Sequence, residues 1–102
     1  MPMPQKQNLT ILGSTGSVGV STLDVVARHA EKFSVVALTA RHQVDLLFEQ
    51  CLRFRPEFAV MLEPRAAETL AAKFKQSGLE CEVLCGVEAL EKVASLPEVD
   101  AV

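Results

Sequence analysis

Three glycines spaced three residues apart, Gly13, Gly16 and Gly19, are the residues with the clearest chemical meaning in this sequence. They follow the short apolar run 9–12 and open a segment with helical spacing. In a strand-turn-helix unit the first glycine allows a tight turn, the second leaves space for a phosphate beside the main chain, and the third lets the helix pack closely. The motif therefore predicts a site for the pyrophosphate of a dinucleotide.

The donors of this turn are main-chain N–H groups. Those of Thr15 to Val18 would face the phosphates at the positive end of the helix. Ser14, Thr15 and Ser17 carry hydroxyls that can add further donors. The turn is not a Walker A loop, because no Lys-Ser/Thr pair follows Gly19. The alternative interpretation is a tight strand-to-helix turn that binds no ligand and packs on small residues.

The end of the second predicted strand indicates which dinucleotide would bind. NAD sites place an Asp or Glu there, about 20 residues after the glycine turn, to bind the ribose 2′-hydroxyl. Here Arg41 and His42 follow the strand, and the nearest acid, Asp45, falls on the next helix. A guanidinium can bind a 2′-phosphate that a carboxylate would repel, so the sequence favours NADPH over NADH. Arg41 could instead be a solvated loop charge, and His42 either contacts the 2′-phosphate or adenine or lies free on the surface.

The other reactive residues form no catalytic or metal-binding pattern. No second Cys or His pair completes a metal site around Cys81 and Cys85, so we interpret these thiols and Cys51 as reduced and buried. His29 belongs to the last turn of the first predicted helix, where we expect it to cap or line that helix. The glutamates scatter over helix faces and turns without a carboxylate pair. We therefore expect no catalytic residue and no metal ligand in this chain.

Short apolar runs alternate with longer helical stretches along the whole sequence. The predicted strands are 9–12, 34–39, 58–62 and 81–85, and the predicted helices are 18–29, 43–53, 64–76 and 87–95. Apolar spacing assigns the inner faces of the first two helices to Val18, Thr22, Val25, Val26 and His29, and to Val44, Leu47, Phe48, Cys51 and Leu52. This β-α-β-α-β-α-β-α order predicts an α/β fold, a Rossmann-like doubly wound parallel sheet with right-handed crossovers.

The end of the chain and the composition bound this fold. Residues 97–102 resemble the approach to a fifth strand beginning at Val99, so we expect a chain truncated there and belonging to a longer protein. The 102 residues, 49% of them hydrophobic, suit one soluble domain, 1–102. A net charge of −3 argues against a nucleic-acid partner, and no apolar run reaches the ~20 residues of a membrane helix. Met1–Gln7 resembles neither a signal nor a transit peptide, which favours the cytoplasm.

The glycine turn and the helix that follows it closely resemble those of the 1-deoxy-D-xylulose 5-phosphate reductoisomerase family. The matching stretches are 9–19, 21–26, 33–40, 50–52, 55–56, 59–60, 83–86 and 97–100. The resemblance implies an oxidoreductase and isomerase of non-mevalonate isoprenoid biosynthesis that uses NADPH and Mg²⁺ or Mn²⁺. Such enzymes convert 1-deoxy-D-xylulose 5-phosphate to 2-C-methyl-D-erythritol 4-phosphate, and they are cytoplasmic homodimers.

Residue by residue, the resemblance implies two groups of cofactor contacts. The family's phosphate contacts fall on Thr15, Gly16, Ser17 and Val18, and its 2′-phosphate loop falls on Ala40, Arg41, His42 and Gln43. Within that loop Arg41 replaces the family's usual Gly and Gln43 replaces its Asn, while the basic character is kept.

The resemblance also implies what the chain lacks. The family's metal-binding carboxylates, substrate-phosphate contacts and nicotinamide-lining segments lie beyond Val102. Residues 1–102 would then hold the adenosine-pyrophosphate half of NADPH and perform no reaction. Two alternatives stay open: a complete nucleotide-sensing module, and the beginning of an enzyme similar to aspartate-semialdehyde dehydrogenase, which has a related glycine turn.

Overall fold

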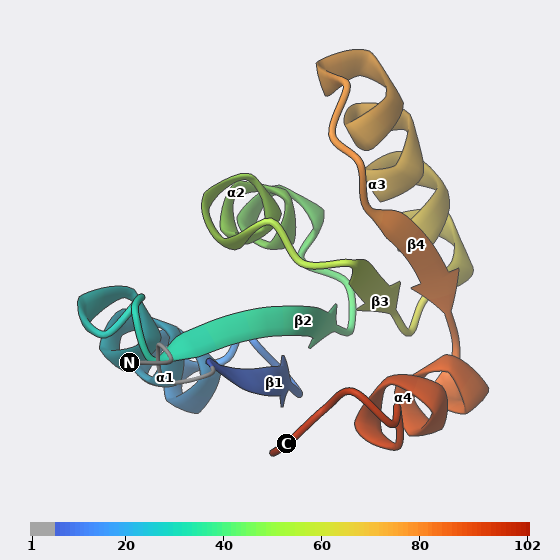
Figure 1. Ribbon diagram of the computed structural model, residues 1–102. Helices are drawn as coiled ribbons and strands as arrows, with labels where there is room; N and C mark the ends of the chain where they lie inside the picture. Colours follow the sequence, from blue (N-terminus) through green and yellow to red (C-terminus); the bar gives the residue numbers. More distant parts are fainter. Residues whose placement is uncertain (1–5) are drawn as a thin grey trace.

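Strands and helices alternate along residues 6–102, the part of the chain that the computed structural model describes (Figure 1). The elements are β1 (Gln7–Ile11), α1 (Ser17–Arg28), β2 (Phe33–Ala40), α2 (Val44–Phe54), β3 (Phe58–Met61), α3 (Pro64–Ser77), β4 (Glu82–Cys85) and α4 (Val87–Ala94). Every predicted element is present, with ends within two residues of the predicted ones. Pro64 begins α3, and Gly78 ends it with a φ of 73°, the usual places for a proline and a glycine at the two ends of a helix.

All strand pairs are parallel, and the order in the sheet is β1-β2-β3-β4. At the other edge of β1 the end of the chain runs beside it, where Ala101 forms a parallel bridge with Leu9 (Figure 1). The amide of Thr10 donates to the carbonyl of Ala101 at 3.1 Å, and the amide of Asp100 donates to the carbonyl of Asn8 at 2.8 Å. The predicted fifth strand is therefore present as one bridge. The bridge lies on the side of β1 that faces away from β2. The direction in which strands are added to the sheet therefore reverses at β1.

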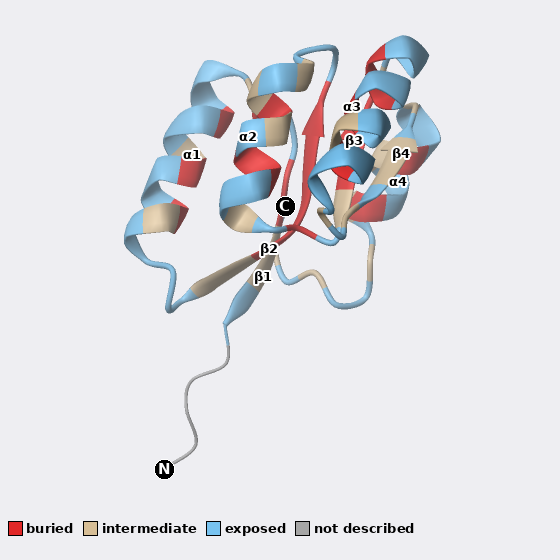
Figure 2. Cartoon of the chain, turned by 90° about the horizontal axis from the view of Figure 1, so that it is seen from above, coloured by how far each residue is buried: buried red, intermediate tan, exposed pale blue. Residues whose placement is uncertain are grey.

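Helices cover both faces of the sheet, which confirms the doubly wound prediction. One core lies beneath α1, α2 and α3 and includes Leu23, Leu47 and Leu70. The second core lies beneath α4 and centres on Val60 and Val93. Figure 2 shows buried segments on the sheet-facing sides of α1 and α2. Because successive strand residues point to opposite faces, the two cores share the same strands without competing for side chains.

The rotation of α1 about its axis differs from the prediction. Its buried residues are Gly19, Leu23 and Val26, whereas Val18 and Val25 of the predicted inner face are 79% and 51% exposed. Positions 19, 23 and 26 form a single helical stripe. A glycine in that stripe lets the helix backbone approach the preceding turn, and this close contact decides which side faces inward. Apolar spacing alone assigned the wrong face because valines occur on both sides.

The same kind of correction applies to α2. Leu47 and Cys51 are buried as predicted, but Leu52 is 39% exposed and the polar Gln50 is buried in its place. No helix within residues 6–102 is long and apolar enough to cross a membrane. The prediction about a signal or transit peptide rests on Met1–Gln7, and residues 1–5 lie outside the described part of the chain.

Candidate nucleotide-binding site

The glycine turn and the Arg41 loop meet at one edge of the sheet. The turn follows β1 and the loop follows β2, and the carboxyl ends of neighbouring parallel strands lie side by side. Thr39 links them: its Oγ1 accepts a hydrogen bond from the amide of Gly13 at 2.9 Å, and its carbonyl accepts one from the amide of Ser14 at 2.8 Å. The two groups of residues predicted to contact the cofactor are therefore brought together.

The three glycines of the turn meet different requirements. Gly13 has a φ of 64°, in the left-handed region that glycine adopts most easily. A Cβ on Gly19 would lie 2.3 Å from the carbonyl oxygen of Gly13 and 2.6 Å from the Cα of Ser14, so the helix contact excludes any side chain. These findings confirm the predicted roles of the first and third glycines.

Gly16 is free of both constraints. Its φ of −76° suits any residue, and a Cβ there would lie 3.4 Å from the carbonyl oxygen of Gly13, an ordinary contact distance. Neither the backbone conformation nor the packing of the described residues requires glycine at this position. A glycine that the fold does not need is expected where a ligand must approach the main chain.

The amino end of α1 offers main-chain donors. No side chain caps it, and its first turn carries no acidic residue. The amide of Gly16 donates to the carbonyl of Gly13 at 3.0 Å, so this N–H is already used inside the turn. The amides of Thr15, Ser17 and Val18 have no acceptor among residues 6–102. Uncapped amides at the positive end of a helix attract an anion.

Ser14 has a structural role, contrary to the prediction that its hydroxyl adds a donor for phosphate. The residue is fully buried. Its hydroxyl donates to Oε1 of Gln50 at 2.7 Å, and Nε2 of Gln50 donates to the carbonyl of Ser14 at 2.8 Å. No pattern in the sequence predicts a role for Gln50 or Thr39. One signal in the sequence could have indicated Gln50: it lies three residues after Leu47 and next to Cys51, so it falls on the apolar face of its helix.

The loop after β2 is held through its backbone alone. The carbonyl of Arg41 accepts from the amide of Glu63 at 3.2 Å, and that of Gln43 accepts from the amide of Leu47 at 3.1 Å. The side chains of Arg41, His42 and Gln43 are exposed and form no hydrogen bond or ion pair within residues 6–102. The positive charge of Arg41 is therefore not paired with an acidic side chain within the described residues.

Asp45, the nearest acid to Arg41 in the sequence, is engaged elsewhere. Its Oδ1 lies 3.1 Å from Nζ of Lys73 on α3. Since no carboxylate within the described residues pairs with Arg41, the loop would present its guanidinium to an anionic ligand without first breaking an ion pair.

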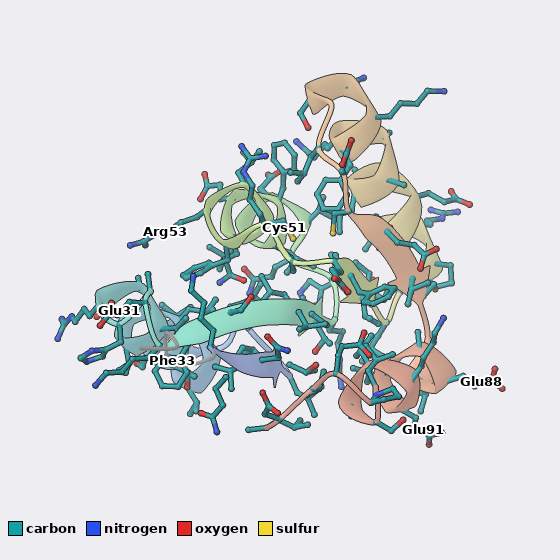
Figure 3. All side chains as sticks on the ribbon, viewed as in Figure 1. Glu31, Phe33, Cys51, Arg53, Glu88 and Glu91 are labelled. Atoms are coloured by element: carbon teal, nitrogen blue, oxygen red, sulfur yellow. The ribbon has the colours of Figure 1, made fainter. Side chains whose placement is uncertain are left out.

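The thiols and carboxylates form no second centre. Cys51 points inward from α2 (Figure 3), and a hydrogen bond with Cys81, together with burial, raises the pKa of its thiol. Cys81 is half-buried and Cys85 is exposed, so the expectation of buried thiols is correct for Cys51 and wrong for Cys85. Glu88 and Glu91 extend from α4 away from the sheet (Figure 3). No three His, Cys, Asp or Glu side chains within residues 6–102 are grouped to hold a metal ion.

A parallel sheet wound on both faces, with a glycine turn after the strand where the winding reverses, defines a Rossmann-like domain. Comparison with known proteins is more specific. Residues 9–102 match the family 1-deoxy-D-xylulose 5-phosphate reductoisomerase, and the chain belongs to this family. The alternative of an enzyme similar to aspartate-semialdehyde dehydrogenase is therefore wrong.

Relatives and solved structures agree with this assignment. The chain is 60% identical over 96 residues to the reductoisomerase of Nitrosospira multiformis, covering 94% of this chain and 24% of the relative. It is 62% identical to that of Nitrosomonas eutropha, covering 94% and 23%. The reductoisomerase of Zymomonas mobilis in complex with NADPH superposes with a TM-score of 0.84 at 34% identity, covering 92% of this chain and 24% of that one. The chain thus spans about a quarter of the length of these relatives.

Proposed function

We propose that this chain binds NADPH through its adenosine-pyrophosphate half. The proposal rests chiefly on Gly16: neither its backbone conformation nor its contacts within the described residues require glycine, and the amides of Thr15, Ser17 and Val18 beside it have no acceptor there. A phosphate placed against the turn would accept hydrogen bonds from the amides of Thr15, Ser17 and Val18. Gly16 would contribute space rather than a donor, because its own amide is already bonded. The exposed hydroxyl of Ser17 and the half-buried Thr15 can add side-chain donors.

The Arg41 loop would select NADPH over NADH. Arg41, His42 and Gln43 lie at the end of β2, where dinucleotide-binding domains contact the adenosine ribose. A guanidinium binds a phosphate in two parallel hydrogen bonds, and a carboxylate that would bind a free 2′-hydroxyl is absent from this loop. The NADPH complex of the Zymomonas mobilis relative supports the choice of cofactor.

The whole protein would convert 1-deoxy-D-xylulose 5-phosphate to 2-C-methyl-D-erythritol 4-phosphate in the cytoplasm, as a homodimer with Mg²⁺ or Mn²⁺. Bound NADPH supplies the hydride for the reduction. Residues 6–102 contribute cofactor binding to this reaction and offer no group of metal ligands. Another solved reductoisomerase that superposes with a TM-score of 0.89 is a magnesium complex, which supports a metal site elsewhere in the whole protein.

The second candidate is a module that binds a dinucleotide and performs no reaction. It shares the cofactor site and differs only in what the rest of the protein does, so activity discriminates the two. We expect the whole protein to oxidise NADPH when given substrate and divalent metal, and residues 1–102 alone to bind without turnover. Metal-dependent NADPH oxidation by the purified 102-residue chain would contradict this division of roles.

Calorimetric titration of the chain with NADPH and with NADH tests the binding proposal. Saturable binding of NADPH, weaker binding of NADH, and loss of both in Gly16→Val are the expected results. If the chain is folded by circular dichroism and neither dinucleotide binds at millimolar concentration, the proposed function is wrong.

A further inference from the structure

We infer that Gln50 is a positioning residue for the glycine turn: it fixes the direction of the Thr15 N–H. The inference rests on the proposed function, because that N–H is one of the donors proposed to face the pyrophosphate. Gln50 lies 36 residues after Ser14, on α2, and it is buried. It cannot touch the ligand proposed for the open side of the turn, so it would act only through the main chain of Ser14.

Both polar atoms of the Gln50 amide are used on one residue. Nε2 donates to the carbonyl of Ser14 at 2.8 Å, and Oε1 accepts from the hydroxyl of Ser14 at 2.7 Å. A carbonyl can only accept, so Nε2 must face it, and this leaves Oε1 for the hydroxyl. The Ser14 hydroxyl also lies 3.3 Å from the carbonyl of Thr39, but turning it fully to that acceptor would leave Oε1 of Gln50 without a partner. Rotation of the Gln50 amide would likewise leave the Ser14 carbonyl without its donor.

The consequence for the turn follows from peptide geometry. The carbonyl of Ser14 and the N–H of Thr15 belong to the same peptide unit, and the chain has no cis peptide bond within the described residues. In a trans peptide the C=O and the N–H point in opposite directions. Since Gln50 holds the carbonyl toward α2, the N–H of Thr15 is directed away from α2, out of the protein interior. This amide has no acceptor within residues 6–102.

No other hydrogen bond within the described residues is made by the two polar atoms of this peptide unit. Thr39 binds the amides of Gly13 and Ser14, which belong to the two preceding peptide units. Ser14 is fully buried, so solvent cannot replace Gln50 at its carbonyl. Without Gln50 the carbonyl would lower its energy by turning toward another donor, and the Thr15 N–H would turn with it. A main-chain donor would then be lost from the proposed phosphate site.

The test compares Gln50→Met with Thr10→Val, two buried polar-to-apolar changes of similar shape. Thr10 donates to the carbonyl of Val93 at 2.8 Å, on the α4 side of the sheet, so Thr10→Val also leaves a carbonyl without its partner but does not touch the turn. Each variant and the unmodified chain are first checked for folding by circular dichroism. Two readouts follow: the affinity for NADPH by calorimetry, and ¹⁵N order parameters of Thr15 and Ser17 without ligand.

We expect Gln50→Met to weaken NADPH binding by about 10- to 100-fold, the loss of one hydrogen bond to a charged group. The order parameter of Thr15 should fall from about 0.85, typical of rigid backbone, to below about 0.6. Thr10→Val should keep its NADPH affinity within about twofold of the unmodified chain, since the lost bond joins β1 to α4 and not to the turn. Two results would overturn the inference: an equal loss of NADPH affinity in Gln50→Met and Thr10→Val, or an unchanged order parameter of the Thr15 amide in Gln50→Met.

Two further outcomes need to be covered: a variant that does not fold, and a chain that does not bind NADPH. If Gln50→Met does not fold, Gln50→Leu replaces it, because leucine also removes both hydrogen-bonding atoms of the side chain. The order parameters then carry the test, since they are measured without ligand. If the unmodified chain does not bind NADPH while Gln50→Met mobilises Thr15, the proposed function fails and the positioning role of Gln50 stands.

Discussion

The turn after β1 and the loop after β2 lie side by side at one edge of the sheet, yet they are held in different ways. The turn is fixed by hydrogen bonds that Thr39 accepts from its amides, by the buried bonds between Gln50 and Ser14, and by the contact between Gly19 and Gly13. The loop is fixed only through its carbonyls, and the side chains of Arg41, His42 and Gln43 are exposed.

This difference separates two parts of recognition. A rigid turn binds a phosphate without a further ordering cost, so it suits the pyrophosphate that all dinucleotides share. An exposed arginine loses side-chain freedom when it binds, which offsets part of its attraction to a 2′-phosphate. We therefore expect the turn to supply most of the affinity and the loop to supply the selectivity.

The largest effect should come from the most constrained position in the turn. Gly19→Ala places a Cβ within 2.3 Å of backbone, so either the helix must move or the fold is lost. We expect the free energy of unfolding to fall by about 3 kcal/mol or more, the upper end for overpacking. Urea denaturation measures it. The matched control is Gly16→Ala, for which a loss below about 1 kcal/mol is expected because its Cβ meets only an ordinary contact.

Gly16→Val should break binding while leaving the fold largely intact. The Cβ of the valine would meet only the carbonyl oxygen of Gly13, at an ordinary contact distance of 3.4 Å, and the side chain would enter the space proposed for the pyrophosphate. We expect no measurable NADPH binding by calorimetry, with the free energy of unfolding lowered by only about 1 kcal/mol, as for a poor N-cap residue. Unchanged affinity would mean that the turn serves structure alone.

Changes at Arg41 should alter selectivity more than affinity. We expect the unmodified chain to bind 2′-phospho-AMP about tenfold more tightly than AMP, the low end for a hydrogen bond to a charged group because the loop is exposed. Arg41→Ala should remove most of this ratio, and Arg41→Asp should reverse it. If the unmodified chain binds both nucleotides to saturation with equal affinity, Arg41 is a solvated loop charge.

The smallest expected effect is that of salt on the same ratio. Raising the ionic strength from about 0.01 M to about 1 M shortens the Debye length from about 30 Å to about 3 Å. The preference for 2′-phospho-AMP should therefore decline with salt in the unmodified chain and stay flat in Arg41→Ala. A decline of equal slope in both proteins would place the 2′-phosphate contact outside Arg41.

The sequence predicted the features that depend on local pattern. The order of strands and helices follows from apolar periodicity, and the constraints on Gly13 and Gly19 follow from their place between a strand and a helix. The exposed position of Arg41 follows from its place after a strand. In each case the physical cause lies within a few residues of the observed feature.

The sequence pattern does not predict features that depend on contacts between segments far apart in the chain. The inner face of α1 is set by the contact of Gly19 with the turn, and valines at positions 18 and 25 hid that face from an apolar count. The sequence predicts a phosphate donor at Ser14 because its actual partner, Gln50, is 36 residues away on α2. Only the packing of α2 beside the turn shows that this hydroxyl is already used.

An NMR titration of the ¹⁵N-labelled chain with NADPH tests the proposed binding site residue by residue. We expect saturable shifts concentrated on the amides of residues 15–18 and 41–43, with the largest at Thr15, Ser17 and Val18, whose N–H groups are free of partners within the described residues. With NADH, the shifts at 15–18 should persist at higher concentration and those at 41–43 should shrink. Saturation with shifts centred elsewhere, such as on α4, would contradict the central claim that the glycine turn and the Arg41 loop together bind the cofactor.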